Sequence, residues 1–450
     1  MTIPPKPPSR PEKVSLRRYL KLFRKDILSA QPEKLYRAWM AEFKTPFFKS
    51  YLVNDPAVIK TVLKERPKDF PKSDRVGAGL RPLLGNSVFL TNGEVWERQR
   101  RIIDPAFEGG RLKDAFPAML AAGEAAVARI RAECCDGFID IEPITSHLAA
   151  DVIFRTLFSI PIEDALATKV FHAFREHQRS QPIINLAAFF RGPQWMPKFF
   201  SRETRQTAEL IRSLIAELTR RRLEDIRNGT APDDLATKIM TTADPETGET
   251  FTEKEMVDQV AIFFLAGHET SASALSWTLY LLATHPDWQA RVAAEVADVD
   301  FCFSALSKLP ITRDVFREAL RLYPPVPMMV REAAQPETFR KRAVKQGSQI
   351  VLSPWHLHRQ NRLWDNPDGF DPARWQTENG KSCGREAYMP FSSGTRVCSG
   401  AGFAMMEGVL LTAILIKTFD VQADPSRNPV PEAQMTVRSR DGIYLRFAQR

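Results

Sequence analysis

Cys398 is the residue whose surroundings most clearly predict chemistry. It lies in the segment Phe391-Ser-Ser-Gly-Thr-Arg-Val-Cys398-Ser-Gly400, directly before a run over residues 401–419 that is apolar on nearly every side. Because a helix that is apolar all round is a buried helix, the cysteine is predicted to sit at a buried helix N-terminus. Free backbone N–H groups and the helix dipole stabilise a thiolate there, and a thiolate can bind a metal. An inert structural cysteine is the alternative interpretation.

Glycines at positions 394, 400 and 402 surround this cysteine. Glycine lets the backbone turn tightly and approach a flat ligand closely, because it has no Cβ atom. Hydrogen-bond donors aimed at the sulfur of such a thiolate would tune its electron density. These glycines are therefore the feature that a flat, metal-bearing ligand would require.

A second chemical pattern lies in the middle of a long helix predicted over residues 252–285 and reads Ala266-Gly267-His268-Glu269-Thr270. At about 1.5 Å per residue this helix spans about 50 Å, which is enough to cross a whole domain. Glycine inside a helix costs about 1 kcal/mol relative to alanine, so the glycine in this pattern requires a specific reason. Taken alone, the threonine would be an ordinary helix-interior residue.

The elements that must position these residues are mostly helical, with a minor β portion. Further helices are predicted over residues 113–134, 149–158, 204–228 and 401–419. Strands are predicted over residues 47–53, 87–90, 349–352 and 435–447, the last with Asp441-Gly442 as a hairpin turn. Thr252 and Glu255 form a capping box at the start of the long helix, and Pro286 ends it. With no internal repeat or linker, the sequence indicates one domain over residues 31–450.

Two further segments have distinctive compositions. Residues 1–30 are Pro-rich and then basic and amphipathic; we predict that the amphipathic part packs on the protein body, and a membrane surface is the alternative. Residues 179–202 are rich in aromatic residues and proline; we predict a mobile apolar lid, and a loop buried against another part of the protein is the alternative.

Composition excludes several classes of protein. Of the 450 residues, 44% are hydrophobic and 26% are charged, which is typical of a folded globular protein. The longest apolar run, residues 408–416, is too short to span a bilayer, and the N-terminus lacks a secretory signal. Five cysteines do not make a disulfide framework in a chain of this length. We therefore expect a soluble, cytoplasmic protein without a transmembrane anchor. No nucleic-acid motif accompanies the net charge of +9; an ordinary solvated surface is the favoured interpretation, and a basic docking face for an acidic partner is the alternative.

Together, Phe391, Gly394, Arg396, Cys398 and Gly400 match the haem-ligand signature of the cytochromes P-450, and the chain resembles this family over residues 4–450. The resemblance implies a mainly helical, triangular-prism-like fold. It places haem b between the long central helix and the helix that follows the cysteine. It also implies that Cys398 is the axial thiolate ligand of a haem-thiolate monooxygenase, in which thiolate donation favours cleavage of the O–O bond.

The pattern in the long helix resembles the oxygen-binding motif of the same family. By that resemblance Ala266 lies against the haem, Thr270 hydrogen-bonds the bound dioxygen and Glu269 feeds protons inward. Cleavage of the O–O bond needs protons delivered to the distal oxygen, so an acid beside an alcohol suits the reaction. We do not expect His268 to bind the iron, because the family places a variable residue there.

Glu318 and Arg321 match the family's Glu-x-x-Arg pair, and Arg374 follows at the expected place. The spacing alone carries no information, because it recurs at Glu217 and Arg220. The resemblance makes the first three residues a buried ionic triad that holds the cysteine loop. We assign them to structure and not to catalysis.

Haem carries two propionates that need cations. Trp96 and Arg100 share one helix face and resemble the family's Trp-x-x-x-Arg pair. The resemblance adds Arg331 and Arg396 as further contacts. Arginine suits carboxylates because its planar fork can donate two parallel hydrogen bonds.

By family position the substrate pocket is lined mostly by sizeable apolar side chains. The predicted wall consists of Phe264, Ala266, Val326, Met328, Met329 and Met435. Such a lining predicts a lipophilic substrate such as a terpenoid, a steroid or a fatty acid.

The reaction also needs electrons. The resemblance extends over nearly the whole chain and leaves no segment for a fused electron-transfer module. We therefore expect the electrons from a separate ferredoxin or flavodoxin with its reductase, and a basic face would suit an acidic carrier. We expect a monomer. A peroxide-driven peroxygenase would be expected to lack Glu269 and Thr270, which this chain retains. A haem-thiolate sensor is the second alternative, and it would consume no electrons in response to substrate.

Overall fold

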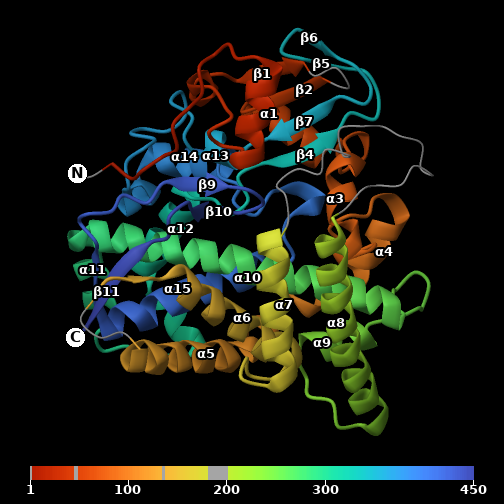
Figure 1. Ribbon diagram of the computed structural model, residues 1–450, viewed down its shortest axis with the longest axis vertical. Helices are drawn as coiled ribbons and strands as arrows, with labels where there is room; N and C mark the ends of the chain where they lie inside the picture. The colour runs from red at the N-terminus through yellow and green to blue at the C-terminus, as the bar shows by residue number, and fades with distance from the viewer. Residues whose placement is uncertain (1–2, 45–48, 134–136, 181–200) are drawn as a thin grey trace.

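The longest helix among the described residues, α10 (Glu253–Thr284), runs across the middle of the molecule (Figure 1). The side chain of Thr252 accepts a hydrogen bond from the backbone N–H of Glu255, and the Glu255 side chain accepts one from the backbone N–H of Thr252. This confirms the predicted capping box. The structure is a computed structural model that describes residues 3–44, 49–133, 137–180 and 201–450. Most of the predicted lid, residues 181–200, lies outside these ranges.

Helices cover α10 on several sides. α6 (Glu142–Phe158) and α8 (Arg202–Asn228) pack directly against it, and α15 (Ala401–Thr418) contacts both α10 and α5 (Arg111–Glu133). α15 is buried along most of its length, as its all-round apolar sequence predicts. It is also the one helix of the described ranges that is long and apolar enough to cross a membrane, with 67% of that window buried inside the protein.

The largest sheet has four strands in the order β1-β2-β7-β4 and lies at the opposite end of the molecule from α5 (Figure 1). β2 and β7 are parallel, and the other neighbouring strands are antiparallel. β7 has the predicted bounds. The four strands are β1 (Met40–Lys44), β2 (Lys49–Val53), β7 (Gln349–Leu352) and β4 (Met329–Glu332).

Smaller sheets and helices complete the architecture and are placed around these elements. The remaining strands are β3 (Ile139–Asp140), β5 (Glu337–Phe339), β6 (Arg342–Val344), β8 (Phe419–Ala423), β9 (Pro431–Ala433), β10 (Val437–Ser439) and β11 (Tyr444–Gln449). The remaining helices are α1 (Leu16–Lys25), α2 (Pro56–Lys60), α3 (Asp74–Leu84), α4 (Gly93–Ile103), α7 (Ala165–Ser180), α9 (Leu235–Thr241), α11 (Pro286–Val296), α12 (Pro310–Leu322), α13 (Pro354–Leu357) and α14 (Glu378–Glu386).

Two strand predictions are wrong. Residues 87–90 form turns, because the chain there wraps around the end of α10, where Gln259 accepts a hydrogen bond from Val88 N–H. The region over residues 435–447 is not a hairpin. β10 pairs with β9, whereas β11 pairs with β3 and β8, so the turn before Gly442 joins two different sheets. Pairing partners distant in sequence decide this arrangement, and a local turn signal does not contain them.

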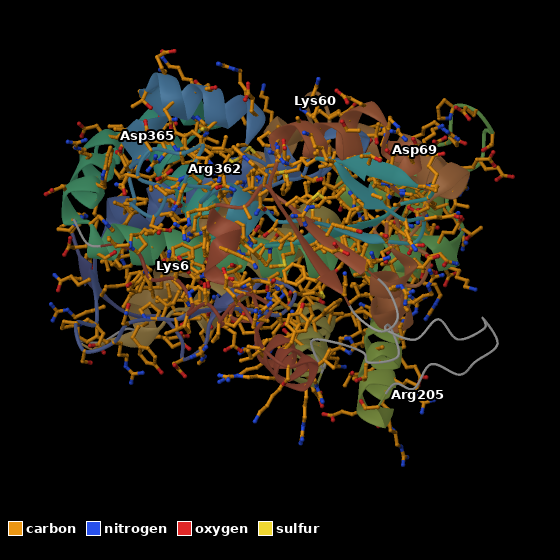
Figure 2. The ribbon with its side chains drawn as sticks, turned by 90° about the horizontal axis from the view of Figure 1, so that it is seen from above. Lys6, Lys60, Asp69, Arg205, Arg362 and Asp365 are labelled. Carbon is orange, nitrogen blue, oxygen red and sulfur yellow. The ribbon has the colours of Figure 1, made fainter. Side chains whose placement is uncertain are left out.

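The N-terminal segment packs on the body of the protein. Pro4 and Pro7 are buried, and Lys6 forms an ion pair of 2.9 Å with Asp368. Figure 2 shows Lys6 within the outline of the folded chain, whereas Arg205 of α8 lies at its edge. In α1 the Tyr19 ring stacks on Phe43 of β1, with 6.4 Å between centroids. This segment therefore continues the fold of the main domain.

Candidate active site

The cysteine loop closes on itself before α15 begins. The backbone N–H of Cys398 donates to the carbonyl of Phe391 at 3.0 Å, and Val397 N–H donates to the Gly394 carbonyl at 3.1 Å. Gly394 has φ +73°, and a Cβ atom there would lie 1.9 Å from the carbonyl oxygen of Leu63. Only glycine fits this position, on both conformational and steric grounds.

The Cys398 side chain is exposed, although protein atoms closely surround it. Burial raises the pKa of its thiol, while the Gly400 backbone N–H and the positive charges of Arg100 and Lys72 act in the opposite direction. Burial thus outweighs the stabilisation of the thiolate that the Gly400 backbone N–H at the start of α15 provides. A thiol in this setting ionises readily when its sulfur binds a metal cation.

Predicted cofactor contacts gather beside this loop. Arg100 of α4 donates to the Val397 carbonyl at 2.8 Å, which ties α4 to the cysteine loop. The guanidinium of Arg396 lies 4.0 Å from the centroid of the Trp96 ring and donates to the Asn92 side chain at 2.8 Å. The structure therefore brings Trp96 and Arg100 of α4 together with Arg396 of the cysteine loop, as the resemblance implied.

Sequence reasoning missed one member of this cluster, Lys72. Its Nζ atom donates to the carbonyl of Phe89 at 2.7 Å and lies 4.1 Å from that residue's ring centroid. A backbone bridge joins Lys72 to Arg331 of β4. The lysine follows a proline in an ordinary loop sequence, so no local signal could have identified it.

These cations repel one another and lack a full set of counter-charges. Burial lowers the pKa of Arg331 to about 10, and burial together with Arg331 and Arg100 lowers that of Arg396 to about 9. Burial and the same three arginines lower the pKa of Lys72. Arg100 pairs with Asp104 at 2.8 Å, and within the described ranges no ion pair joins the other three cations to a carboxylate. Buried cations need anions, and two propionate carboxylates would supply them.

On the other side of the site, α10 has accessible surface at one place along its buried middle. Ala266 is exposed and Thr270 half-exposed, and the Thr270 hydroxyl donates to the Ala266 carbonyl. The helix is continuous through this pattern. A Cβ atom on Gly267 would lie 2.3 Å from Cδ1 of Ile153, so close packing of α6 on α10 accounts for this glycine.

Glu269 and His268 form contacts with elements other than α10. Glu269 is buried and forms an ion pair with Arg438 at 2.9 Å. Burial raises the pKa of Glu269, and the Arg438 guanidinium opposes that shift. Because the Arg438 side chain is 46% exposed, it connects this carboxyl group to solvent. His268 bonds Ser146 of α6 at 2.7 Å.

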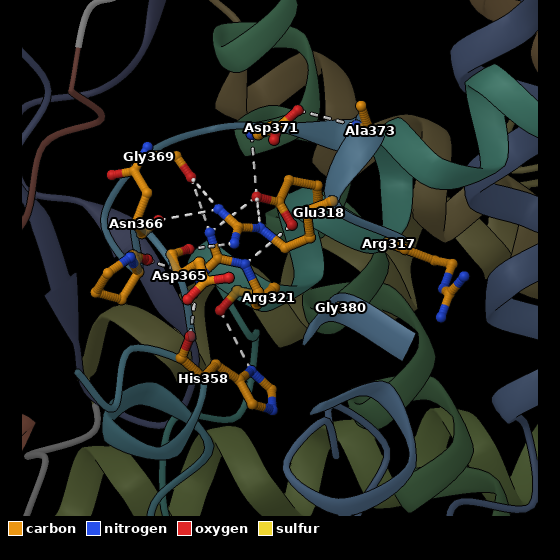
Figure 3. Close-up of polar contacts among 12 residues, drawn as sticks. Arg317, Glu318, Arg321, His358, Asp365, Asn366, Gly369, Asp371, Ala373 and Gly380 are labelled. Atoms are coloured by element: carbon orange, nitrogen blue, oxygen red, sulfur yellow. Dashed lines mark hydrogen bonds and ion pairs between the residues drawn. The ribbon is translucent and has the colours of Figure 1, made fainter. Parts of the chain in front are cut away.

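The predicted ionic triad is present and buried (Figure 3). Glu318 accepts from Arg321 at 2.8 and 2.9 Å and from Arg374 at 3.0 Å. Both arginines also donate to the backbone carbonyl of Gly369. Burial alone would raise the pKa of Glu318, but the two guanidinium groups outweigh it and lower the pKa. The cluster thus fixes the segment around Gly369 against α12.

The predicted substrate-pocket residues divide into two groups. Val326 and Met435 are 36% and 41% exposed, and Met328 and Met329 are half-buried, so these four apolar side chains keep accessible surface. Phe264 has almost no accessible surface, so the prediction that it lines the pocket is wrong. Its ring is 2% exposed and packs against two phenylalanines of the neighbouring helices α6 and α7, each 4.7 Å away between centroids.

Comparisons with known proteins identify the family. The sequence matches the family described as Cytochrome P450 over residues 24–447. It is 30% identical to cytochrome P450 4A11 of Homo sapiens over 425 residues, which cover 87% of this chain and 78% of that protein. It is also 30% identical to cytochrome P450 4A10 of Mus musculus over 426 residues, which cover 88% and 81% of the two chains. The crystal structure of the cytochrome P450DA heme domain superposes with a TM-score of 0.82 at 25% identity, covering 100% of this chain and 97% of that chain. The chain belongs to the cytochrome P450 family.

Family membership confirms the expected class of enzyme, a monooxygenase among the oxidoreductases, and the mainly helical fold. It also confirms the cofactor, because this family binds haem b through a cysteine thiolate. The residues present fit that group. Cys398 offers an accessible sulfur, and Arg331, Arg396 and Lys72 offer cations that no described carboxylate neutralises.

Proposed function

We propose that this monooxygenase inserts one oxygen atom from dioxygen into a lipophilic small molecule, such as a terpenoid, a steroid or a fatty acid. The observation that supports this substrate class is the apolar character of the accessible side chains predicted to line the pocket. Val326, Met328, Met329 and Met435 all keep accessible surface, and none can ionise. Pockets lined in this way bind ligands mainly by removing apolar surface from water.

The bound haem supplies activation of dioxygen, and the residues of this chain hold the haem and control protons. Cys398 would provide the sulfur ligand, and Arg100, Arg331, Arg396 and Lys72 would hold the propionate carboxylates. The Thr270 hydroxyl, which donates to the Ala266 carbonyl, has its lone pairs free to accept a further proton or hydrogen bond.

Glu269 is the acid that supplies protons to this region. Its carboxyl group is buried, so burial favours the protonated form, and the partly exposed Arg438 beside it leads toward solvent. A buried acid with a raised pKa next to a polar route to water is able to take up a proton from solvent and release it inward.

The electrons come from a separate small carrier, a ferredoxin or flavodoxin with its reductase. The net charge of +9 supports an acidic carrier, because opposite charge increases the rate of encounter between two proteins.

The test begins with a screen of lipophilic compounds for a spectral shift of the haem. With a compound that binds, Thr270→Ala should keep haem and substrate binding but lower the product formed per electron consumed, by about tenfold or more. Thr284→Ala is the matched control, because Thr284 lies in the same helix and its hydroxyl donates to the carbonyl four residues earlier at 2.9 Å. Fully coupled turnover in Thr270→Ala would contradict the proposal, as would preferential binding of charged polar compounds.

A further inference from the structure

His358 links the buried ionic triad to the segment that carries the cysteine. It follows α13 and is fully buried. Its Nδ1 atom lies 3.2 Å from the carbonyl oxygen of Arg321, and the two are joined by a dashed line in Figure 3. Its Nε2 atom lies 2.9 Å from the backbone nitrogen of Met389. One imidazole ring thus contacts both α12 and the approach to the cysteine loop.

The two partners determine where the proton of this ring resides. A carbonyl oxygen only accepts and a backbone N–H only donates, so His358 must carry its proton on Nδ1 and leave Nε2 as an acceptor. The cationic form of the ring could not accept from Met389. Burial and the charges of Arg321 and Arg359 disfavour that form and lower the pKa of His358 to about 3. The Tyr388 ring packs beside it with 5.3 Å between centroids.

Met389 begins a short path of hydrogen bonds to the cysteine. Its carbonyl accepts from Ser392 N–H at 3.2 Å, which starts the turn of the loop. Two residues after Met389, the carbonyl of Phe391 accepts from the N–H of Cys398 at 3.0 Å. A shift of Met389 would therefore be transmitted to the backbone of Cys398 through these two turns.

We propose that His358 is a positioning residue for the axial cysteine, acting as a neutral imidazole that couples the Glu318–Arg321 ion pair to the Met389 backbone. It does not touch the reacting atoms. Its role is to hold the start of the cysteine loop at a fixed distance from α12 and thereby to fix the backbone position of Cys398.

A neighbouring histidine provides the matched control. His356 is equally buried, and burial lowers its pKa to about 3 as well. Its Nδ1 atom bonds the Ser353 hydroxyl at 2.8 Å, and its ring packs on Tyr36. None of these contacts, all within the described part of the chain, leads to Met389.

Two variants separate the two hydrogen bonds of His358. In His358→Gln the side-chain amide places an acceptor near the position of Nε2, so it can keep the hydrogen bond from Met389. In His358→Asn the shorter side chain places a donor near the position of Nδ1 and cannot reach Met389. In His358→Asn we expect the Met389 amide to exchange with solvent on the order of tenfold to a hundredfold faster, in haem-free and haem-loaded protein alike. In the same variant we also expect that, compared with the wild type, a larger share of the reduced carbon monoxide adduct lacks the red-shifted absorbance of thiolate ligation. His356→Gln should resemble the wild type in both measurements, and His358→Gln, which keeps only the bond from Met389, should lie between the wild type and His358→Asn.

Equal behaviour of His358→Asn and His358→Gln, or an effect of His356→Gln as large as that of His358→Asn, would overturn the proposal. If the His358 variants do not fold, nitrogen NMR of the wild-type reduced carbon monoxide complex decides the matter. The proposal requires a neutral His358 ring with its proton on Nδ1 from about pH 5 to about pH 9. A proton on Nε2, or titration within that range, would contradict it.

Discussion

Removing the charge of Glu318 tests the ionic triad most severely. Glu318 is 0% exposed and accepts hydrogen bonds from Arg321 at 2.8 and 2.9 Å, from Arg374 at 3.0 Å and from Asp371 N–H at 3.1 Å. In Glu318→Gln, an amide NH₂ group replaces one accepting oxygen and faces these donors. Two buried guanidinium groups then lack a counter-charge, which costs about 3–5 kcal/mol of unfolding free energy.

The matched control is Glu217→Gln in α8, the same substitution in a Glu-x-x-Arg pair of the same spacing. Glu217 contacts Arg220 at 2.8 Å, but its side chain is 35% exposed, so water can replace the lost interaction. Urea unfolding of both variants, followed by tryptophan fluorescence, measures the difference. A large loss is expected for Glu318→Gln and a midpoint close to wild type for Glu217→Gln. Equal shifts in the two variants would refute the reasoning.

Three further predictions concern other parts of the site. Gly394→Ala should lose haem on gel filtration, because its Cβ atom would collide with a backbone carbonyl, while Gly109→Ala, with φ +63° and no atom within 4 Å, should retain it. Arg438→Met removes a positive charge that lowers the pKa of Glu269, so it should raise that pKa further and move the pH profile of coupled turnover toward higher pH. An unchanged profile would exclude electrostatic coupling between Arg438 and Glu269. Burial raises the pKa of Glu407 to about 8. The unfolded chain therefore releases this proton at lower pH than the folded protein does. As a result, the free energy of unfolding falls as pH rises from about 4.5 to about 8. Glu407→Gln should therefore exceed the wild type in unfolding free energy by more than about 1 kcal/mol at pH 8, measured by urea titration, and parallel pH curves would contradict this.

Local patterns in the sequence predicted much of this site because each depends on near neighbours. The capping box and Pro286 set the bounds of α10, and the all-round apolar sequence after Cys398 predicted that α15 is buried. The ionic triad was predictable only through the family resemblance, since the same Glu-x-x-Arg spacing occurs at the half-exposed Glu217.

The features that the sequence could not supply depend on contacts between distant segments. Lys72 joins the cation cluster through a bridge to Arg331, and His358 reaches Met389 across 31 positions. The chain after Met435 fails to form a hairpin because β10 and β11 find other partners. Phe264 lies two residues before Ala266, which places it on a different side of the helix and into the core.

The reduced carbon monoxide spectrum of wild type and Cys398→Ser tests the central claim most directly, since that claim is that the Cys398 sulfur is the axial ligand of the haem. The wild type should show the strongly red-shifted absorbance of a thiolate-ligated haem, and Cys398→Ser should lose it while still binding haem. An unchanged red shift in Cys398→Ser, or a wild-type spectrum of histidine ligation, would contradict the account.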